Sequence, residues 1–104
     1  MEDFVVRGNL YELYGGLLSG NQKKVYELHV IDDMSFTEIG EEMGTSRQAA
    51  QELFRRADEK LKRIEDTLGL ETKFLKIRKL AEDICRSAED PAIRKLAGDI
   101  IDGI

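Results

Sequence analysis

Residues 35–62 read SFTEIGEEMGTSRQAAQELFRRADEKLK, and this stretch decides the fold. Ser35, with Glu38 three positions later, forms a capping box, which predicts that a short helix begins directly after it. Gly44 predicts the end of that helix, because glycine adopts the left-handed conformation that commonly closes helices. A longer helix is then predicted over residues 47–67. Two helices joined by a three-residue turn that contains glycine have the layout of a helix-turn-helix.

The apolar residues of this stretch fit two helices that cross. Ile39 of the short helix, residues 36–43, faces the predicted core and meets Ala50 and Phe54 of the long helix. Gly40 places no side chain where the two helices approach closely. The stripe of the long helix recurs at spacings of three and four, at Ala50, Phe54, Ala57, Leu61, Ile64 and Leu68.

Two further helices are predicted before this stretch, one over residues 9–18 and one from residue 22 to residue 30 or 31. Two adjacent glycines weaken the end of the first helix. Ser19 is a suitable cap for the second, and Asp32 ends it. The first helix has apolar residues at the spacing of one buried face, at Leu10, Leu13, Tyr14, Leu17 and Leu18.

Two helices are also predicted after it, one over residues 70–87 and one that begins at Asp90-Pro91, where Asp caps and Pro occupies the first turn. We expect an all-α protein with a helix-turn-helix domain, residues 1–68, and a C-terminal helical extension, residues 69–104. The extension either folds back as a hairpin or lies against a second subunit. Its stripes are candidates for a homodimer interface, at Phe74, Ile77, Leu80 and Ile84 and at Ile93, Leu96 and Ile100.

The composition excludes several classes of protein. The only cysteine, Cys85, cannot form an internal disulfide, and the only histidine, His29, leaves no His-Cys metal cluster. No serine has a His–Asp setting, and Gly15-Gly16 lacks the Lys-Ser/Thr of a phosphate-binding loop. We therefore expect no enzyme activity, no metal and no cofactor.

No apolar run approaches the ~20 residues of a membrane span. The N-terminal residues MEDFVVRGNL carry acids where a signal peptide has basic residues. A single free thiol also suits a reducing compartment. We expect a cytoplasmic protein with no membrane partner.

The net charge is −5, and the excess acid lies in residues 1–68, with 9 Lys/Arg against 14 Asp/Glu. Residues 69–104 hold 7 of each. Within the acidic part, residues 44–63 carry six basic residues against three acids. Electrostatic interactions are screened over ~8 Å at physiological salt, so a local basic helix can bind an anion despite the acidic body.

The start and the outer face of the long helix form the candidate nucleic-acid interface. Glutamine suits adenine edges, arginine suits guanine or phosphate, and glutamate can accept from cytosine. Backbone N–H groups at the start of the helix can meet a phosphate. The same residues also fit a merely solvated helix face or a protein-interaction module. The candidate residues are Ser46, Arg47, Gln48, Gln51, Glu52, Arg55, Arg56 and Lys60.

Residues 17–63, LLSGNQKKVYELHVIDDMSFTEIGEEMGTSRQAAQELFRRADEKLKR, resemble region four of the bacterial sigma-seventy factors. The shared pattern is an initial leucine pair, a Gln-bearing helix, Asp-Asp-Met-Ser, and EIGEEMGTSRQAA. The whole chain more closely resembles the YlxM family of small bacterial proteins, in its length, NLYELYGGLL, SRQAA and a charged helical extension. These resemblances imply a sigma-factor region-four-like bundle with a two-helix C-terminal extension.

The YlxM resemblance implies a non-catalytic accessory or regulatory protein of the signal recognition particle pathway. Its helix-turn-helix would bind the particle RNA, the particle GTPase subunit, or duplex DNA. Leu53 and Ala49 stand where sigma-type helices often present polar residues, which disfavours sequence-specific reading. The alternatives are a DNA-binding transcription regulator of sigma-like origin and a scaffold that meets a basic partner. The acidic face of such a scaffold comprises Asp32, Asp33, Glu38, Glu41 and Glu42.

Overall fold

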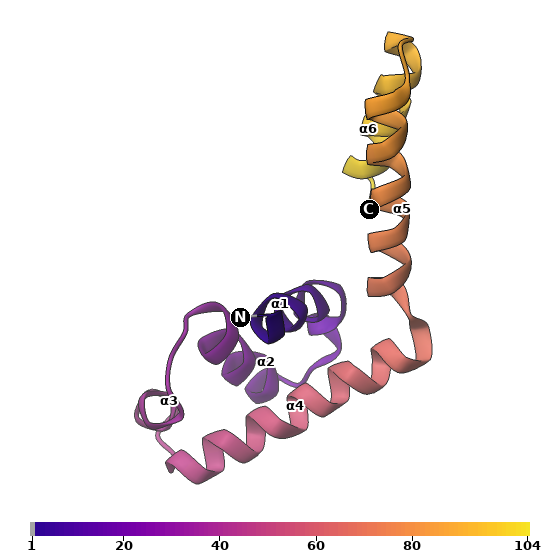
Figure 1. The fold of residues 1–104 in the computed structure, drawn as a ribbon. Helices are drawn as coiled ribbons and strands as arrows, with labels where there is room; N and C mark the ends of the chain where they lie inside the picture. Colours follow the sequence, from indigo (N-terminus) through magenta and orange to yellow (C-terminus); the bar gives the residue numbers. More distant parts are fainter. Residues whose placement is uncertain (1) are drawn as a thin grey trace. The chain divides into compact units, whose positions relative to one another are not determined.

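The computed structural model describes residues 2–104, with side chains from Phe4 onward. No strand occurs in this described part, and the predicted all-α fold is confirmed. The chain forms two compact units, one that ends at Leu68 and one that spans Gly69–Ile104. The α-helices are α1 (Glu2–Tyr14), α2 (Gly20–Tyr26), α3 (Phe36–Met43), α4 (Arg47–Leu68), α5 (Leu70–Ser87) and α6 (Pro91–Asp102), labelled in Figure 1.

Local capping signals set the bounds of α3 and α4 as predicted. The Ser35 hydroxyl accepts the Glu38 N–H at 3.2 Å, and the Glu38 carboxylate accepts the Ser35 N–H at 3.0 Å. Gly44 closes α3 in the left-handed conformation, with φ 69°. Ser46 caps α4, because its hydroxyl accepts the Ala49 N–H at 3.0 Å. The helix-turn-helix layout predicted from the sequence is therefore present.

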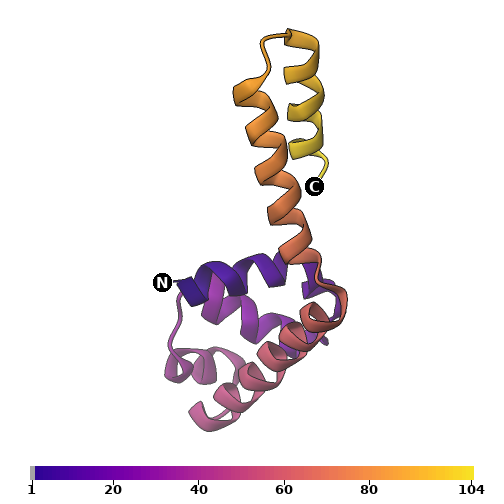
Figure 2. The ribbon, with the colours of Figure 1, turned by 45° about the vertical axis from the view of Figure 1, so that its right-hand side comes forward.

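The second unit is a hairpin of α5 and α6, one of the two arrangements that the sequence left open. Gly69 precedes α5 in the left-handed conformation, with φ 64°. Asp90 caps α6 by accepting a first-turn N–H at 2.9 Å, and Pro91 begins the helix. The two helices run antiparallel and side by side in Figures 1 and 2. Within residues 69–104, Ala81 and Ala97 are the buried residues.

The first helix differs from the predicted range of 9–18. α1 spans Glu2–Tyr14, and Gly15–Leu17 follow as a 3-10 turn. The sequence pattern misses the start because the apolar residues before Leu10 are exposed and form no buried stripe. The two glycines end the α-helix early and change the direction of the chain. Leu17, which was predicted to be buried, is therefore exposed.

The second helix also differs from the prediction, which runs unbroken from residue 22 to residue 30 or 31. Ser19 caps α2 as predicted, but α2 ends at Tyr26 and a π segment follows over Glu27–Ile31. The N–H after this segment bonds to the carbonyl five residues back, at 3.0 Å, which widens the turn. The π segment contains His29, whose ring contacts come from other helices. A pattern with a period of 3.6 residues cannot register this departure.

Aromatic rings fill the interior of the first unit. The fully buried Tyr26 stacks between Tyr11 and Phe54, with ring centroids 5.5 and 5.1 Å apart. His29 stacks on Phe36 at 4.3 Å and meets Phe54 edge-on at 4.6 Å. These contacts join α1, α2, the π segment, α3 and α4 through stacked and edge-to-face rings.

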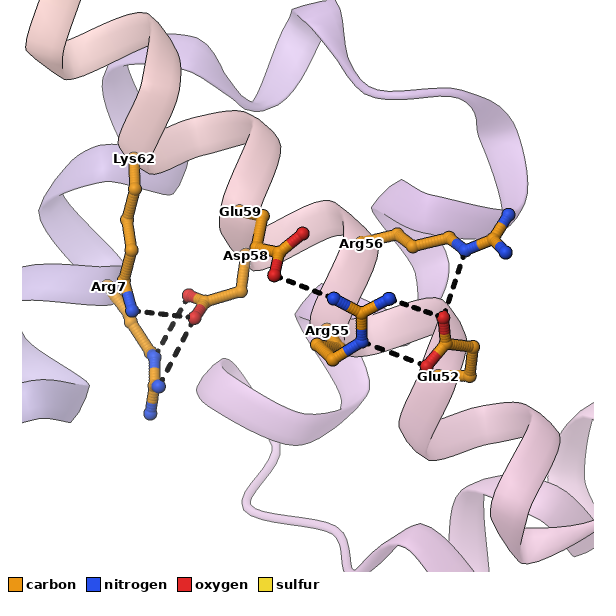
Figure 3. Close-up of polar contacts among 7 residues, drawn as sticks. All are labelled: Arg7, Glu52, Arg55, Arg56, Asp58, Glu59 and Lys62. Atoms are coloured by element: carbon orange, nitrogen blue, oxygen red, sulfur yellow. Dashed lines mark hydrogen bonds and ion pairs between the residues drawn. The ribbon is translucent and has the colours of Figure 1, made fainter.

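A buried carboxylate, Asp58, ties α1 and α2 to α4, and Figure 3 shows its contacts with Arg7 and Lys62. Arg7 donates from Nε at 3.0 Å and from Nη2 at 3.3 Å, and the Tyr26 hydroxyl donates at 3.2 Å. The Lys62 Nζ lies 3.0 Å from the second carboxylate oxygen. Burial alone raises the pKa of Asp58, but the hydrogen bonds and charges of Arg7 and Lys62 outweigh it and lower this pKa below its ordinary value.

Gly40 lies against the backbone of the turn between α3 and α4. A Cβ at this position would be 2.8 Å from the Thr45 carbonyl oxygen and 3.1 and 3.2 Å from backbone atoms of Ser46 and Arg47. Backbone atoms cannot swing aside as a flexible side chain can. The close approach predicted at Gly40 is confirmed, and it fixes the distance between α3 and the start of α4.

We expect Gly40→Ala to lower the free energy of unfolding by about 2 kcal/mol, because the added methyl group overpacks this contact. Urea unfolding followed by circular dichroism measures the change. Gly8→Ala is the matched control, since a Cβ there meets nothing within 4 Å and alanine stabilises a helix interior by roughly 0.5–1 kcal/mol. Equal effects of the two substitutions would contradict the close contact.

Asp58 predicts a pH-dependent stability. Its pKa in the folded chain lies below the ordinary value of 3.8, so its ionised form stabilises the fold above that pH, and the contribution is lost as the pH falls through the folded-state pKa. Asp58→Asn should lower the free energy of unfolding by about 2 kcal/mol at neutral pH. The gap from wild type should narrow below pH 3.8 in urea unfolding. Asp66→Asn, exposed on the same helix, is the control, and a gap that stays constant with pH would refute the role of the Asp58 charge.

Candidate nucleic-acid interface

The core contacts of α4 decide which of its side chains reach solvent. Ala50, Phe54, Ala57 and Leu61 are buried on one side, where Ile39 of α3 also packs. The opposite side of α4 therefore points away from the first unit over its first three turns. The periodicity that places the apolar residues of α4 in the core also places its polar residues on this outward side.

Most of the predicted site residues gather on this outward side. At about 100° per residue, they lie within less than half a turn of one another, opposite Ala50. All of them are exposed. This surface, called the α4 face below, comprises Gln48, Gln51, Glu52, Arg55 and Arg56.

The other three predicted residues lie at the start of α4 or at the edges of the α4 face. Ser46 lies at the start of α4, where its hydroxyl is engaged in capping. Arg47 is exposed at the first position of the helix, on the flank nearer Ala50. Lys60 lies four residues after Arg56, about 40° around the helix, at the edge of the α4 face, and is half-buried.

Glu52 holds both arginines of the α4 face (Figure 3). Arg55 donates to its two oxygens at 2.9 and 2.6 Å, and Arg56 donates at 3.1 Å. Arg55 also donates to Glu59 at 2.6 Å. The hydrogen bonds from Arg55 and then from Arg56 lower the pKa of Glu52 to about 2, and Glu52 in turn raises the pKa of Arg55. Glu52 is therefore ionised at neutral pH.

This network has no net charge, because the two arginines of the α4 face are paired with two glutamates, Glu52 within the face and Glu59 beside it. Exposed ion pairs of this kind are weak, so a phosphate can replace a glutamate as the partner of an arginine. Glu52 therefore controls how much positive charge the α4 face offers to a ligand.

Two acids with structural roles were absent from the predicted site. Glu59 follows Arg55 by four residues, which is the spacing of an ion pair along a helix. This pair could therefore have been predicted from the sequence. Asp58 and Arg7 are 51 residues apart, and no local pattern links them. The available hint was an acid directly beside the apolar stripe of α4.

The remaining candidates do not form a second site. From Phe4 onward, where the side chains are described, no group of three His, Cys, Asp or Glu residues is placed to hold a metal ion. None of the described helices is long and apolar enough to cross a membrane. Cys85 is half-buried, and its thiol lies 3.7 Å from the Arg94 carbonyl oxygen. His29 is part of the aromatic interior.

A short helix, a glycine turn and a longer helix with a polar outer face define a helix-turn-helix protein. The chain belongs to the UPF0122 family, described as "Putative helix-turn-helix protein, YlxM / p13 like", which matches residues 1–98. The predicted membership of the YlxM family is confirmed. The helix-turn-helix of this family indicates nucleic-acid binding.

Relatives from several bacteria align with most of the chain. The UPF0122 protein of Thermoanaerobacter sp. (strain X514) is 34% identical over 106 residues, covering 95% of this chain and 91% of the relative. That of Clostridium botulinum (strain Alaska E43 / Type E3) is 40% identical over 79 residues, covering 76% and 72%. That of Halalkalibacterium halodurans is 33% identical over 93 residues, covering 88% and 85%. No solved structure matches the chain significantly.

Glu52→Gln should raise the affinity for nucleic acid by about three- to tenfold at low salt, because it frees Arg56 for phosphates and leaves Arg55 paired with Glu59 alone. The logarithm of affinity should also fall more steeply with salt, by about one additional released counterion. Fluorescence anisotropy with labelled RNA and duplex DNA measures both quantities. Glu12→Gln, exposed on α1, makes the same change in net charge. An equal gain in affinity from Glu12→Gln would show that Glu52 does not mask the arginines of the α4 face.

Proposed function

We propose that this protein is a non-catalytic accessory or regulatory protein of the signal recognition particle pathway, which binds the particle RNA through the α4 face. The particle is what the resemblance to the YlxM family implies, and the family match over residues 1–98 supports that resemblance. The observation that carries the mode of binding is an exposed arginine pair on a recognition helix whose preceding helix is acidic. The proposal concerns contacts with the sugar-phosphate backbone rather than with base edges.

The charge of α3 argues against docking in the major groove of DNA. α3 carries three exposed carboxylates, Glu38, Glu41 and Glu42, and no basic residue. In a helix-turn-helix bound to duplex DNA, the first motif helix crosses the phosphate backbone. Three acids there would face phosphates at close range, and like charges repel. This repulsion is avoided if the α4 face contacts a nucleic acid while α3 stays away from the phosphates.

The α4 face is also poorly equipped to read bases. A bidentate contact from Arg55 to guanine requires breaking its bonds to both Glu52 and Glu59. Ala49 and Leu53, beside it, offer no polar side-chain group. A phosphate contact needs only a cation near the backbone, which positions a protein without reading sequence. Structured RNA is recognised largely in this way, by shape and backbone.

Two observations favour other partners. Gln48 and Gln51 are exposed and match adenine edges, which favours the alternative of a DNA-binding transcription regulator of sigma-like origin. The exposed acids of α3 suit a basic protein surface, and the particle GTPase subunit would then contact α3 while the RNA contacts α4. Each alternative predicts a different dependence on these side chains.

The deciding experiment is a binding titration of the full chain against particle RNA, the particle with its GTPase subunit, and mixed-sequence duplex DNA. We expect saturable binding to the RNA or particle that survives physiological salt. Arg55→Ala with Arg56→Ala should weaken it by about tenfold or more and reduce the salt slope by about two. Lys23→Ala with Lys24→Ala, exposed on α2, removes the same charge and should have a much smaller effect.

Tight binding to a subset of duplexes, with the particle ignored, would overturn the proposal. In that case Gln48→Ala and Gln51→Ala should change the sequence preference. Equal losses from the arginine and lysine pairs would show that general charge, and not the α4 face, supports binding.

A further inference from the structure

The hairpin of α5 and α6 carries the same eight-residue segment twice. Residues 77–84 read IRKLAEDI, and residues 93–100 read IRKLAGDI, with Glu82 and Gly98 as the only difference. The first copy lies within α5 and the second within α6. In each copy the alanine, Ala81 or Ala97, is buried. The two helices therefore meet through equivalent positions of the repeat.

Because the helices are antiparallel, equivalent positions of the repeat point to the same side of the hairpin. In each helix an Ile, a Leu and an Ile lie four before, one before and three after the buried alanine. At about 100° per residue, these positions are all rotated to one side of the alanine, by roughly 40–100°. Antiparallel helices that face each other turn this side in one common direction. This apolar face comprises Ile77, Leu80, Ile84, Ile93, Leu96 and Ile100.

Within the hairpin, neither helix covers the apolar face. Its six side chains are between 38% and 64% exposed, although all are large and aliphatic. Together they present on the order of 500 Å² of apolar surface, near the upper end of what soluble monomers expose. The unit spans only Gly69–Ile104, and units below about 40 residues usually need a disulfide, a metal or a partner subunit. The hairpin thus has too little interior of its own.

We propose that the apolar face binds the same face of a second copy of this chain, so that two hairpins form a four-helix bundle. A twofold dimer requires one surface that is complementary to itself. The repeat supplies this, because either helix of one copy can lie over either helix of the other with the same aliphatic residues in contact. Four apolar stripes of this kind form the core of a four-helix bundle. The proposal does not rest on the proposed function.

Area and charge both agree with a second copy as the occupant. A stable pair buries about 800 Å² per partner, a little over half of it apolar, which is close to what the apolar face offers. Residues 69–104 hold 7 basic and 7 acidic residues, so two hairpins meet without net repulsion. The excess negative charge lies in residues 1–68.

The test measures the mass of the full chain by light scattering after size exclusion, up to about 200 µM, since a dimer depends on concentration. Wild type should show twice the monomer mass of 11.8 kDa. Leu80→Glu with Leu96→Glu should raise the dissociation constant about 100-fold or more and give monomer. Leu75→Glu is the control, because Leu75 is 52% exposed but lies on the other side of α5. This control should remain a dimer.

A wild-type mass of 11.8 kDa at every concentration would overturn the proposal without any variant. A dimer that survives the double substitution, or that Leu75→Glu disrupts equally, would overturn it as well. Circular dichroism checks that the variants keep their helices. If the double glutamate variant loses them, Leu80→Gln with Leu96→Gln takes its place and is held to the same outcomes.

Discussion

The first unit depends on one buried charge. Asp58 has its carboxylate inside the fold, where an unpaired ion would be costly, and donors from α1 and α2 satisfy it. Those donors cannot reach it unless α1 and α2 lie across α4 in one register, so the ion pair specifies the arrangement that the aromatic rings then fill. On the next position, Glu59 is exposed and pairs with Arg55. Burial alone gives these two neighbouring acids different roles, one in the fold and one as a partner of Arg55 beside the α4 face.

The bounds of α3, α4 and α5 and the start of α6 could be predicted because short signals decide them. A capping box, a left-handed glycine and an Asp-Pro start each act within about four residues. The start of α1 could not, since its first residues bury no stripe. The π segment could not either, because it accompanies contacts of His29 with Phe36 and Phe54 that exist only in the fold.

For the candidate site, periodicity predicted which residues of α4 face outward. It did not predict that Glu52 and Glu59 would engage Arg55, although the spacing of three and four residues allowed it.

A stretch of sequence with an excess of basic residues can still offer a ligand little positive charge, when acids of the same helix pair with its arginines. Residues 44–63 carry an excess of three positive charges, yet the arginines of the α4 face are engaged by glutamates of the same helix. Weak exposed ion pairs of this kind are exchanged easily, so they reduce affinity without abolishing it. Such masking favours a ligand that presents many phosphates in a fixed geometry over one that offers a few, and it limits adventitious binding to any polyanion.

The two units bury different kinds of side chain. Large rings occupy the interior of the first unit, where four helices surround them. Between α5 and α6 the buried residues are Ala81 and Ala97, which let two helices approach closely but remove little apolar surface from water. Small residues at the contact leave the larger aliphatic side chains of the repeat on the outside. A hairpin optimised to stand alone would place leucine and isoleucine between its helices, and this one places them where a further layer of helices can cover them. The repeated aliphatic residues therefore contribute little to the contact between α5 and α6. Their arrangement is explained by the proposed contact with a second hairpin.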